Sequence, residues 1–181
     1  MIKKIIIING NGEVGKDTFV ELVSEFIPVM NFSSVDKVKN IAKEIGWDGV
    51  SKTEKDRKFL ADLKALTKEY CDMPFESMKE KVEEFRQNEV SQCLFLHIRE
   101  PEEIQRAVKE FGAITVLITR DSVKQITSNA ADANVYNYSY DYEITNNGTI
   151  DSFRRIASFF AKTLLNNNKI TLESLGGIEN E

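Results

Sequence analysis

One segment near the start of the chain has the residue types and the spacing of a loop that binds phosphate. It follows the pattern G-x-x-x-x-G-K and consists of Gly10, Asn11, Gly12, Glu13, Val14, Gly15, Lys16, Asp17 and Thr18. Glycines let backbone N–H groups approach a phosphate closely, and a helix that begins near Lys16 adds its positive dipole end. Lys16 can place its charge between two adjoining phosphates, and Thr18 offers a hydroxyl near a Mg²⁺ ion. The alternative is a glycine-rich turn with a lysine in solvent.

The elements around this segment have to position it. Five short segments are typical of strands, most of them apolar runs, and they span residues 5–8, 29–32, 93–98, 113–119 and 140–145. Segments with apolar residues at helical spacing separate them, at 19–27, 38–45, 54–70, 75–85, 101–111 and 150–164. Strands that alternate with helices predict an α/β fold with a mainly parallel sheet. A strand before the loop and a helix after it favour phosphate binding over the plain turn.

Two arginines directly follow predicted strands. Arg99 follows the run 93–98, and Arg120 follows the run 113–119. Ligands of parallel sheets bind beyond the carboxyl ends of the strands, so both side chains are expected at the ligand edge. Transfer of a phosphoryl group needs positive charge around it, and these two residues are candidates to supply it. Both can equally belong to surface salt bridges.

Other residues leave a functional and a structural interpretation open. Arg57, Lys64 and Lys68 share one side of a predicted helix, where they form either an acceptor site or a solvated basic face. The alternating tyrosines at positions 136, 138, 140 and 142 have strand-like spacing, which suits either stacking on a base or packing at a sheet edge. Asp36 is either an acceptor ligand or a helix N-cap.

Four short motifs, in this order, resemble those of P-loop kinases that act on small phosphorylated metabolites. Gly-Lys-Asp-Thr at 15–18 is similar to the loop of deoxynucleoside monophosphate kinases, adenylate-kinase-like proteins and animal-type phosphomevalonate kinases. Asp-Lys-Val-Lys at 36–39 resembles their Asp-Pro-Leu-Lys, and Leu-His-Ile-Arg at 96–99 resembles their strand ending in Asp-x-Arg. The segment 141–149 is similar to their Asp-x-x-Ile-x-Asn-x-Gly-Thr. The resemblance covers roughly residues 2 to 165, and only the first motif is specific.

The resemblance implies a three-layer P-loop NTPase fold with a five-stranded sheet flanked by helices. It implies one domain over 1–165, with acceptor-binding helices at about 34–90, a short lid-like region at about 121–139, and a loosely attached tail at 166–181. ATP and Mg²⁺ are the implied cofactors, and a phosphorylated small molecule is the implied substrate. ATP would bind the loop 10–18 and Asn146, the metal would bind Thr18, and the acceptor would bind Asp36, Lys39 and Arg57. Lys16, Arg99 and Arg120 would be catalytic.

The function implied is ATP-dependent transfer to a (deoxy)nucleoside monophosphate. A phosphomevalonate-type acceptor is one alternative, and a nucleotide-binding module whose chemistry has decayed is another. Two departures from the family pattern support the last: His97 stands where those kinases carry an Asp, and the lid region offers only Arg120 and Lys124. His97 can also be a strand residue bonded to one neighbour. Asn146 can also belong to an ordinary Asn-Gly turn.

Composition sets outer bounds on these interpretations. The 181 residues are 41% hydrophobic and 29% charged, which excludes a disordered chain. A net charge of −5 argues against binding to a nucleic-acid polymer or an acidic membrane surface. Two distant cysteines and the lack of a long apolar run predict a cytoplasmic protein without a membrane span. The oligomeric state is left open.

Overall fold

The structure is a computed structural model that describes residues 2–51, 53–123 and 134–165. The chain forms two compact units, one made of the residues up to Asn31 together with those from Asn88 onward, the other of Phe32–Gln87. Within the described ranges, no helix is both long and apolar enough to cross a membrane. The interpretation of 1–165 as a single domain stays a prediction, and the predicted tail lies outside the described residues.

The first unit contains a five-stranded sheet in the order β2-β3-β1-β4-β5, except that the last two residues of β2 belong to the second unit. The strands are β1 (Lys4–Asn9), β2 (Val29–Ser33), β3 (Cys93–His97), β4 (Ile114–Thr119) and β5 (Tyr142–Thr145). β1 pairs in parallel with both β3 and β4, and β4 pairs in parallel with β5. The central strands are buried along nearly their whole length, as the unbroken apolar runs predicted.

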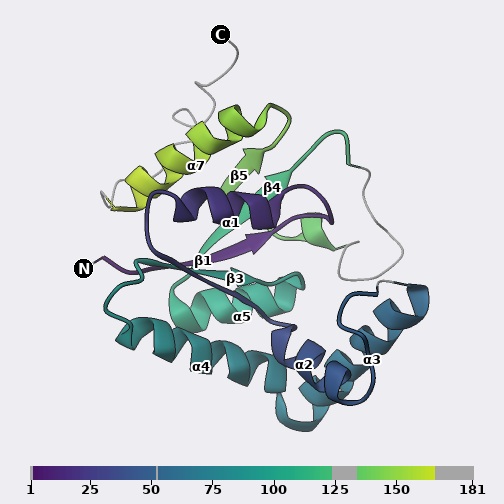
Figure 1. Cartoon of the computed structure of the whole chain (residues 1–181). Helices are drawn as coiled ribbons and strands as arrows, with labels where there is room; N and C mark the ends of the chain where they lie inside the picture. The colour runs from purple at the N-terminus through teal and green to yellow at the C-terminus, as the bar shows by residue number, and fades with distance from the viewer. Residues whose placement is uncertain (1, 52, 124–133, 166–181) are drawn as a thin grey trace. The chain divides into compact units, whose positions relative to one another are not determined.

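Helices cover both faces of this sheet (Figure 1). α1 (Lys16–Ser24) and α7 (Ile150–Leu165) pack together on one face, and α5 (Pro101–Phe111) lies on the other. Pro101 starts α5, and Gly112 ends it with a positive φ of 66°, so the helix covers the predicted range 101–111. The α/β fold class with a parallel five-stranded sheet is therefore confirmed.

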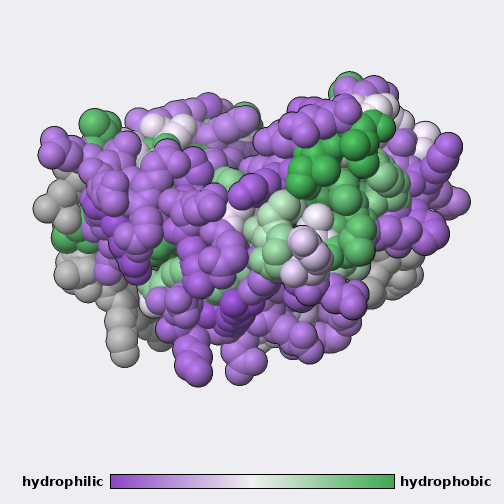
Figure 2. Space-filling model, turned by 90° about the horizontal axis from the view of Figure 1, so that it is seen from below, coloured by the Kyte–Doolittle hydropathy of each residue, from purple (hydrophilic) through white to green (hydrophobic). Residues whose placement is uncertain are grey.

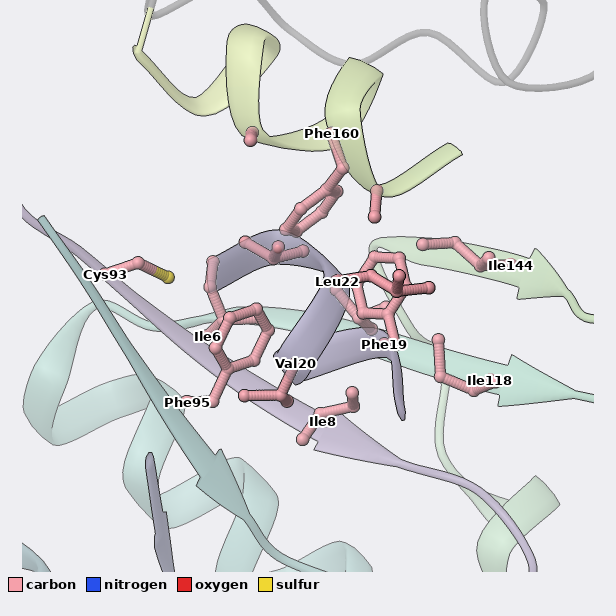
Figure 3. Close-up of a cluster of buried hydrophobic side chains, with 14 of the residues drawn as sticks. Ile6, Ile8, Phe19, Val20, Leu22, Cys93, Phe95, Ile118, Ile144 and Phe160 are labelled. Atoms are coloured by element: carbon pink, nitrogen blue, oxygen red, sulfur yellow. The ribbon is translucent and has the colours of Figure 1, made fainter. Parts of the chain in front are cut away.

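An aromatic core fixes α1 and α7 against the sheet (Figure 3). The ring of Phe19 lies 5.4 Å from the rings of both Phe153 and Phe160, and it meets Phe95 of β3 edge-on at 6.4 Å. All four side chains are buried, and each buried aromatic side chain contributes a large apolar area to the core. This packing holds the N-terminus of α1 at a fixed place above the end of β1.

The parallel strands all end at one edge of the sheet. In the paired register Ile8 of β1 lies opposite His97 of β3, and Thr119 of β4 lies opposite Thr145 of β5. The residues that follow β1, β3, β4 and β5 therefore leave the sheet at the same edge. This edge carries the start of the glycine loop and both strand-end arginines.

The second unit contains α2 (Asp36–Glu44), α3 (Glu54–Cys71) and α4 (Met73–Gln87). Thr53 and Asp56 form a capping box at the start of α3, which satisfies backbone N–H groups of its first turn. The helix was predicted correctly, but none of its residues is buried, and Leu66 and Tyr70 on its apolar side are 63% and 87% exposed. Figure 2 shows hydrophobic side chains gathered in one area of an otherwise mostly hydrophilic face.

Candidate phosphate-binding site

The backbone of the glycine loop requires glycine at two positions. Gly10 has a φ of 146°, and a Cβ atom there would collide with the carbonyl oxygen of Ile118 in β4. Gly15 has a φ of 99° and is the N-cap of α1. Residues with a Cβ rarely adopt such angles, so these glycines maintain a loop that lies close to β4 at one end and opens into a helix at the other. The loop and the helix were predicted in this arrangement.

Lys16 is the first residue of α1, and its side chain folds back over the loop. Its Nζ donates to the carbonyl oxygens of Gly10 at 2.7 Å and of Asn11 at 2.6 Å. An ammonium group held at the loop's own oxygens lies among the backbone groups that the motif offers to phosphate. The structure therefore places the predicted cation at the predicted loop.

The first turn of α1 also presents two oxygen ligands. Asp17 is exposed and Thr18 is half-buried. Carboxylate and hydroxyl oxygens suit Mg²⁺, which in phosphate sites usually takes its other ligands from phosphates and water. Among the described residues no three His, Cys, Asp or Glu side chains gather into a metal site, so a Mg²⁺ ion here would depend on the phosphates of its nucleotide. The donor set fits a nucleotide-bound magnesium rather than a protein-only site.

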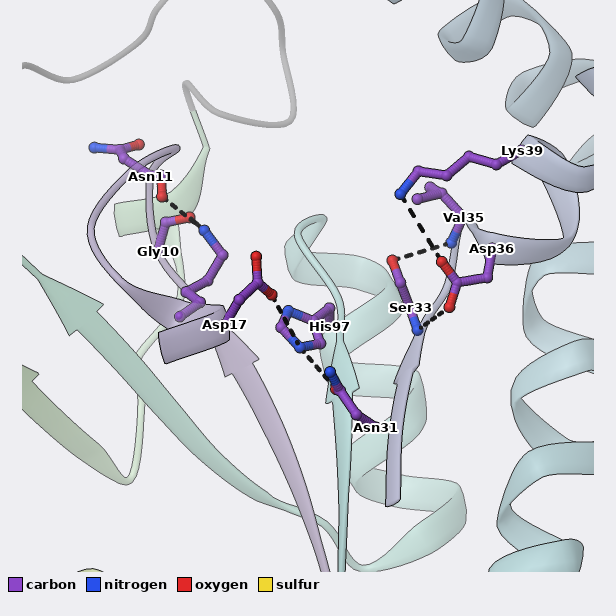
Figure 4. Close-up of polar contacts among 10 residues, drawn as sticks. Gly10, Asn11, Asp17, Asn31, Ser33, Val35, Asp36, Lys39 and His97 are labelled. Carbon is purple, nitrogen blue, oxygen red and sulfur yellow. Dashed lines mark hydrogen bonds and ion pairs between the residues drawn. The ribbon is translucent and has the colours of Figure 1, made fainter. Parts of the chain in front are cut away.

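His97, at the end of β3, points towards β2 and α1 (Figure 4). Its Nε2 lies 2.9 Å from Oδ1 of Asn31, and 3.9 Å from Oδ1 of Asp17. Because an amide oxygen only accepts, Nε2 carries a proton and donates it to Asn31. The side chain is only 13% exposed. These contacts agree with a strand histidine bonded to a neighbouring strand, although its role in catalysis stays a prediction.

The two strand-end arginines leave the sheet at the edge that carries the loop. Arg99 comes two residues after β3 and Arg120 directly after β4, and both are exposed. The carbonyl of Arg99 accepts a hydrogen bond from Asn9, at the start of the loop. The carbonyl of Arg120 accepts from Val123 in the turn that follows. The predicted common edge is observed, and a phosphate role for these side chains stays a prediction.

Asn146, directly after β5, is bonded to the loop. Its Nδ2 donates to the carbonyl of Val14 at 2.9 Å, and its backbone N–H donates to the carbonyl of Thr119 at 2.8 Å. The neighbouring Asn147 exchanges bonds with Asp121 after β4. The segment is thus more than a local turn, because it ties the end of β5 to both the loop and β4.

A polar cluster beside the loop was not predicted from the sequence, and it contains two of the alternating tyrosines. Val135–Asn137 form a short 3₁₀ helix and β5 begins at Tyr142, so the strand-like spacing of the four tyrosines does not come from one strand. Instead, the Tyr136 hydroxyl accepts from Nδ2 of Asn11 at 3.2 Å, and the Tyr140 hydroxyl accepts from Nδ2 of Asn9 at 2.7 Å. Burial raises the pKa of Tyr140 to about 12. The available signal was Asn9 itself, a polar residue that ends a run of four isoleucines.

The predicted acceptor residues lie in the second unit. Asp36 is the first residue of α2 and not its N-cap, which is Val35, and its Oδ2 accepts from the backbone N–H of Ser33 at 2.8 Å. Lys39 lies 3.9 Å from the same carboxylate, and Arg57 is exposed on α3. The N-cap alternative for Asp36 was wrong because its side chain bonds backward to a residue before the helix. Acceptor binding by these residues, and the predicted lid, whose residues 124–133 lie outside the described ranges, stay predictions.

Comparison with known proteins supports the fold. No family model matches the chain, and no curated protein matches it. A protein named TT1252 from Thermus thermophilus is 19% identical over 90% of this chain and 98% of its own, with a TM-score of 0.50. The tunicamycin resistance protein of Deinococcus radiodurans (14% identity, 93% and 97% coverage, TM-score 0.49) and a gluconokinase from Sinorhizobium meliloti 1021 (12%, 92% and 95%, 0.47) are also similar. At this identity the first likeness shows the α/β fold alone.

Proposed function

We propose that the protein transfers a phosphoryl group from ATP to a small phosphorylated acceptor, with a (deoxy)nucleoside monophosphate as the first candidate. One observation carries this proposal: the loop between β1 and α1 has two glycines with positive φ, and the ammonium group of Lys16 lies against its backbone. Strand, glycine loop, lysine and helix N-terminus together form the arrangement that binds nucleotide phosphates.

In this proposal the loop residues and Lys16 hold the phosphates of ATP, and Asn146 supports the loop from the end of β5. Mg²⁺ would be held by Thr18, with Asp17 beside it, and would neutralise part of the charge on the phosphates. Arg99 and Arg120 spread positive charge around the group in transfer. Charge on that group is distributed over several oxygens in the transition state, so two arginines that follow β3 and β4, the strands on either side of β1, suit it.

A phosphate oxygen as the attacking group agrees with the surroundings of His97. The oxygen attacks the γ-phosphorus, a new P–O bond forms, the bond to the oxygen bridging the β- and γ-phosphates breaks, and ADP leaves. A phosphate monoester is already largely ionised at pH 7, because its second pKa is about 6, so no base has to remove a proton. The Nε2 of His97 carries a proton that it gives to Asn31. An alcohol acceptor would need a base, whereas a phosphorylated one does not.

A nucleotide-binding module without transfer is the second candidate, because His97 stands where a carboxylate is expected. Calorimetry with ATP and Mg²⁺, followed by a transfer assay with nucleoside monophosphates and mevalonate phosphate, separates the two. We expect binding and transfer. Firm binding with no transfer to any acceptor would favour the module, and transfer to mevalonate phosphate alone would change the substrate class.

The variant Lys16→Ala tests whether the ammonium group at the loop contributes to ATP binding. We expect ATP to bind roughly 10- to 100-fold more weakly, since a charge-assisted hydrogen bond contributes about 1.5–3 kcal/mol. Lys162→Ala is the matched control, because Lys162 is an exposed lysine in the last turn of α7. Equal ATP affinity in the two folded variants would contradict phosphate binding at the loop.

A further inference from the structure

The last residue of β1 is an asparagine buried beyond the reach of solvent. Asn9 is 0% exposed and follows four isoleucines that are buried too. Its carboxamide contacts three segments: Oδ1 accepts from the backbone N–H of Gly10 at 2.8 Å, while Nδ2 donates to the carbonyl of Arg99 at 3.2 Å and to the hydroxyl of Tyr140 at 2.7 Å. A buried amide is costly unless it is hydrogen-bonded, and this one has a partner for its oxygen and for both its N–H groups.

The chemistry of the partners fixes which way this amide faces. The N–H of Gly10 can only donate, so it needs the oxygen of Asn9, and the carbonyl of Arg99 can only accept, so it needs the nitrogen. The hydroxyl of Tyr140 donates its own proton to the carbonyl of Val135 at 2.8 Å, which leaves it to accept from Asn9. One acceptor and two donors are required at this position, and a primary amide is the side chain of this size that supplies them.

The carboxamide therefore connects the start of the phosphate loop to the backbone of a predicted catalytic residue. The N–H of Gly10 donates to Oδ1 of Asn9, and the carbonyl of the same Gly10 accepts from the ammonium group of Lys16. On the nitrogen side lies Arg99, whose side chain is exposed at the same edge of the sheet. The backbone of Gly10, at the start of the loop, and the backbone of Arg99 are thus bonded to the same buried side chain.

We infer that Asn9 is a positioning residue, which sets the backbone of Arg99 relative to the phosphate loop during phosphoryl transfer. This inference rests on the proposed function. A displacement of about 1 Å at a group that stabilises a transition state can cost about 100-fold in rate. A bond between the end of β1 and the segment after β3 restrains that displacement, and the side chain that makes it is 0% exposed.

A double-mutant cycle between Asn9 and Arg99 tests it. Asn9→Asp keeps an oxygen for Gly10 but replaces the nitrogen that serves Arg99 and Tyr140 with a second oxygen. We expect Arg99→Ala to lower kcat by roughly 30-fold or more in the wild type and by less than about threefold in the Asn9→Asp background, because Arg99 is already misplaced there. KM for ATP should change by less than about threefold in Asn9→Asp, since the bond to Gly10 remains.

The controls separate positioning from plain loss of stability. Leu164→Ala removes a buried side chain in the last turn of α7, far along the chain from the loop, and its effect should combine additively with that of Arg99→Ala. If Asn9→Asp does not fold, Asn9→Ser takes its place in the double-mutant cycle. The inference would be overturned if Arg99→Ala lowered kcat by the same factor, within about twofold, in the wild type and in Asn9→Asp. It would also be overturned if that factor became smaller by the same amount in the Leu164→Ala background.

The proposed function can fail separately. If the wild type transfers phosphate but Arg99→Ala leaves kcat unchanged, the kinase stands and the positioning role of Asn9 is refuted. If the wild type transfers phosphate to no acceptor, the proposed function is refuted and the positioning role falls with it.

Discussion

The side-chain amide of Asn146 donates a hydrogen bond to the carbonyl of Val14, which lies 132 residues earlier in the chain. The loop between β1 and α1 is therefore supported from the end of β5. The same Nδ2 atom would lie 2.6 Å from a Cβ atom added at Gly15. Any side chain at this position would therefore collide with the amide that supports the loop.

Gly15→Ala should therefore destabilise the protein in two ways. A positive φ in a residue with a Cβ costs roughly 1–3 kcal/mol, and the contact with Asn146 adds to that cost. Gly46→Ala is the matched control, since Gly46 has a φ of 111° but no atom within 4 Å of its Cβ position. Urea unfolding should show the larger loss for Gly15→Ala, and Asn146→Ala should recover part of the difference. Equal losses of unfolding free energy in the two variants would mean that the contact with Asn146 does not add to the cost.

Replacing either strand-end arginine should affect the rate more than substrate affinity. Arg99→Ala and Arg120→Ala should lower kcat by up to about 10³-fold with a smaller change in KM, because an arginine that stabilises the transferring phosphoryl group acts mainly in the transition state. Steady-state kinetics with varied ATP measures both constants. Arg155→Ala, at an exposed position on α7, controls for the loss of a surface charge. Wild-type turnover in both variants would return these arginines to a surface role.

His97→Ala should be tolerated. With a phosphate oxygen as the attacking group no base is needed, so we expect kcat within about tenfold of the wild type. The lost bond to Asn31 should cost about 1 kcal/mol of unfolding free energy, and Asn31→Ala should cost a similar amount. A fall in kcat of more than about 100-fold in His97→Ala, without such a fall in Asn31→Ala, would give the imidazole a direct chemical role.

The stability of the wild type should fall between pH 10 and pH 12 in a way that depends on Tyr140. Burial raises the pKa of this hydroxyl from 10.0 to about 12, so in this range the unfolded chain loses the proton before the folded chain does. The contribution is complete below pH 10 and is lost as pH rises through 12. Tyr140→Phe removes the titrating group and should flatten the decline in unfolding free energy measured by urea at several pH values. Parallel pH curves for the two proteins would contradict this assignment.

Local patterns in the sequence were enough to predict the fold and the order of strand, glycine loop and helix at its start. The run of isoleucines in β1, the glycines after it and the amphipathic α1 each depend on neighbours within a few residues. The arrangement of strand ends at one edge also followed, because parallel strands share their direction.

The supporting contacts could not be predicted in this way. Asn9 bonds to Arg99 and Tyr140, and Asn11 to Tyr136, across 90 or more residues, and no local period records such pairs. The tyrosines alternate along the sequence, yet only Tyr142 lies in a strand, because residue spacing alone does not show whether a segment pairs with a sheet. Burial along α3 was also beyond local reasoning, since a helical period shows which side is apolar but not whether another element covers it.

The order of strands in the sheet has a consequence for how the site comes into being. β1 is made first, yet its partners are β3 and β4: Lys4 pairs with Cys93, and Ile6 pairs with Ile114. Closing such long loops carries an entropy cost before any pairing compensates for it, so we expect the centre of the sheet to form late in folding. During synthesis the glycine loop leaves the ribosome long before β3 and β4, the strands that pair with β1. The loop can therefore take up its folded arrangement beside these strands only once more than half of the sequence has emerged.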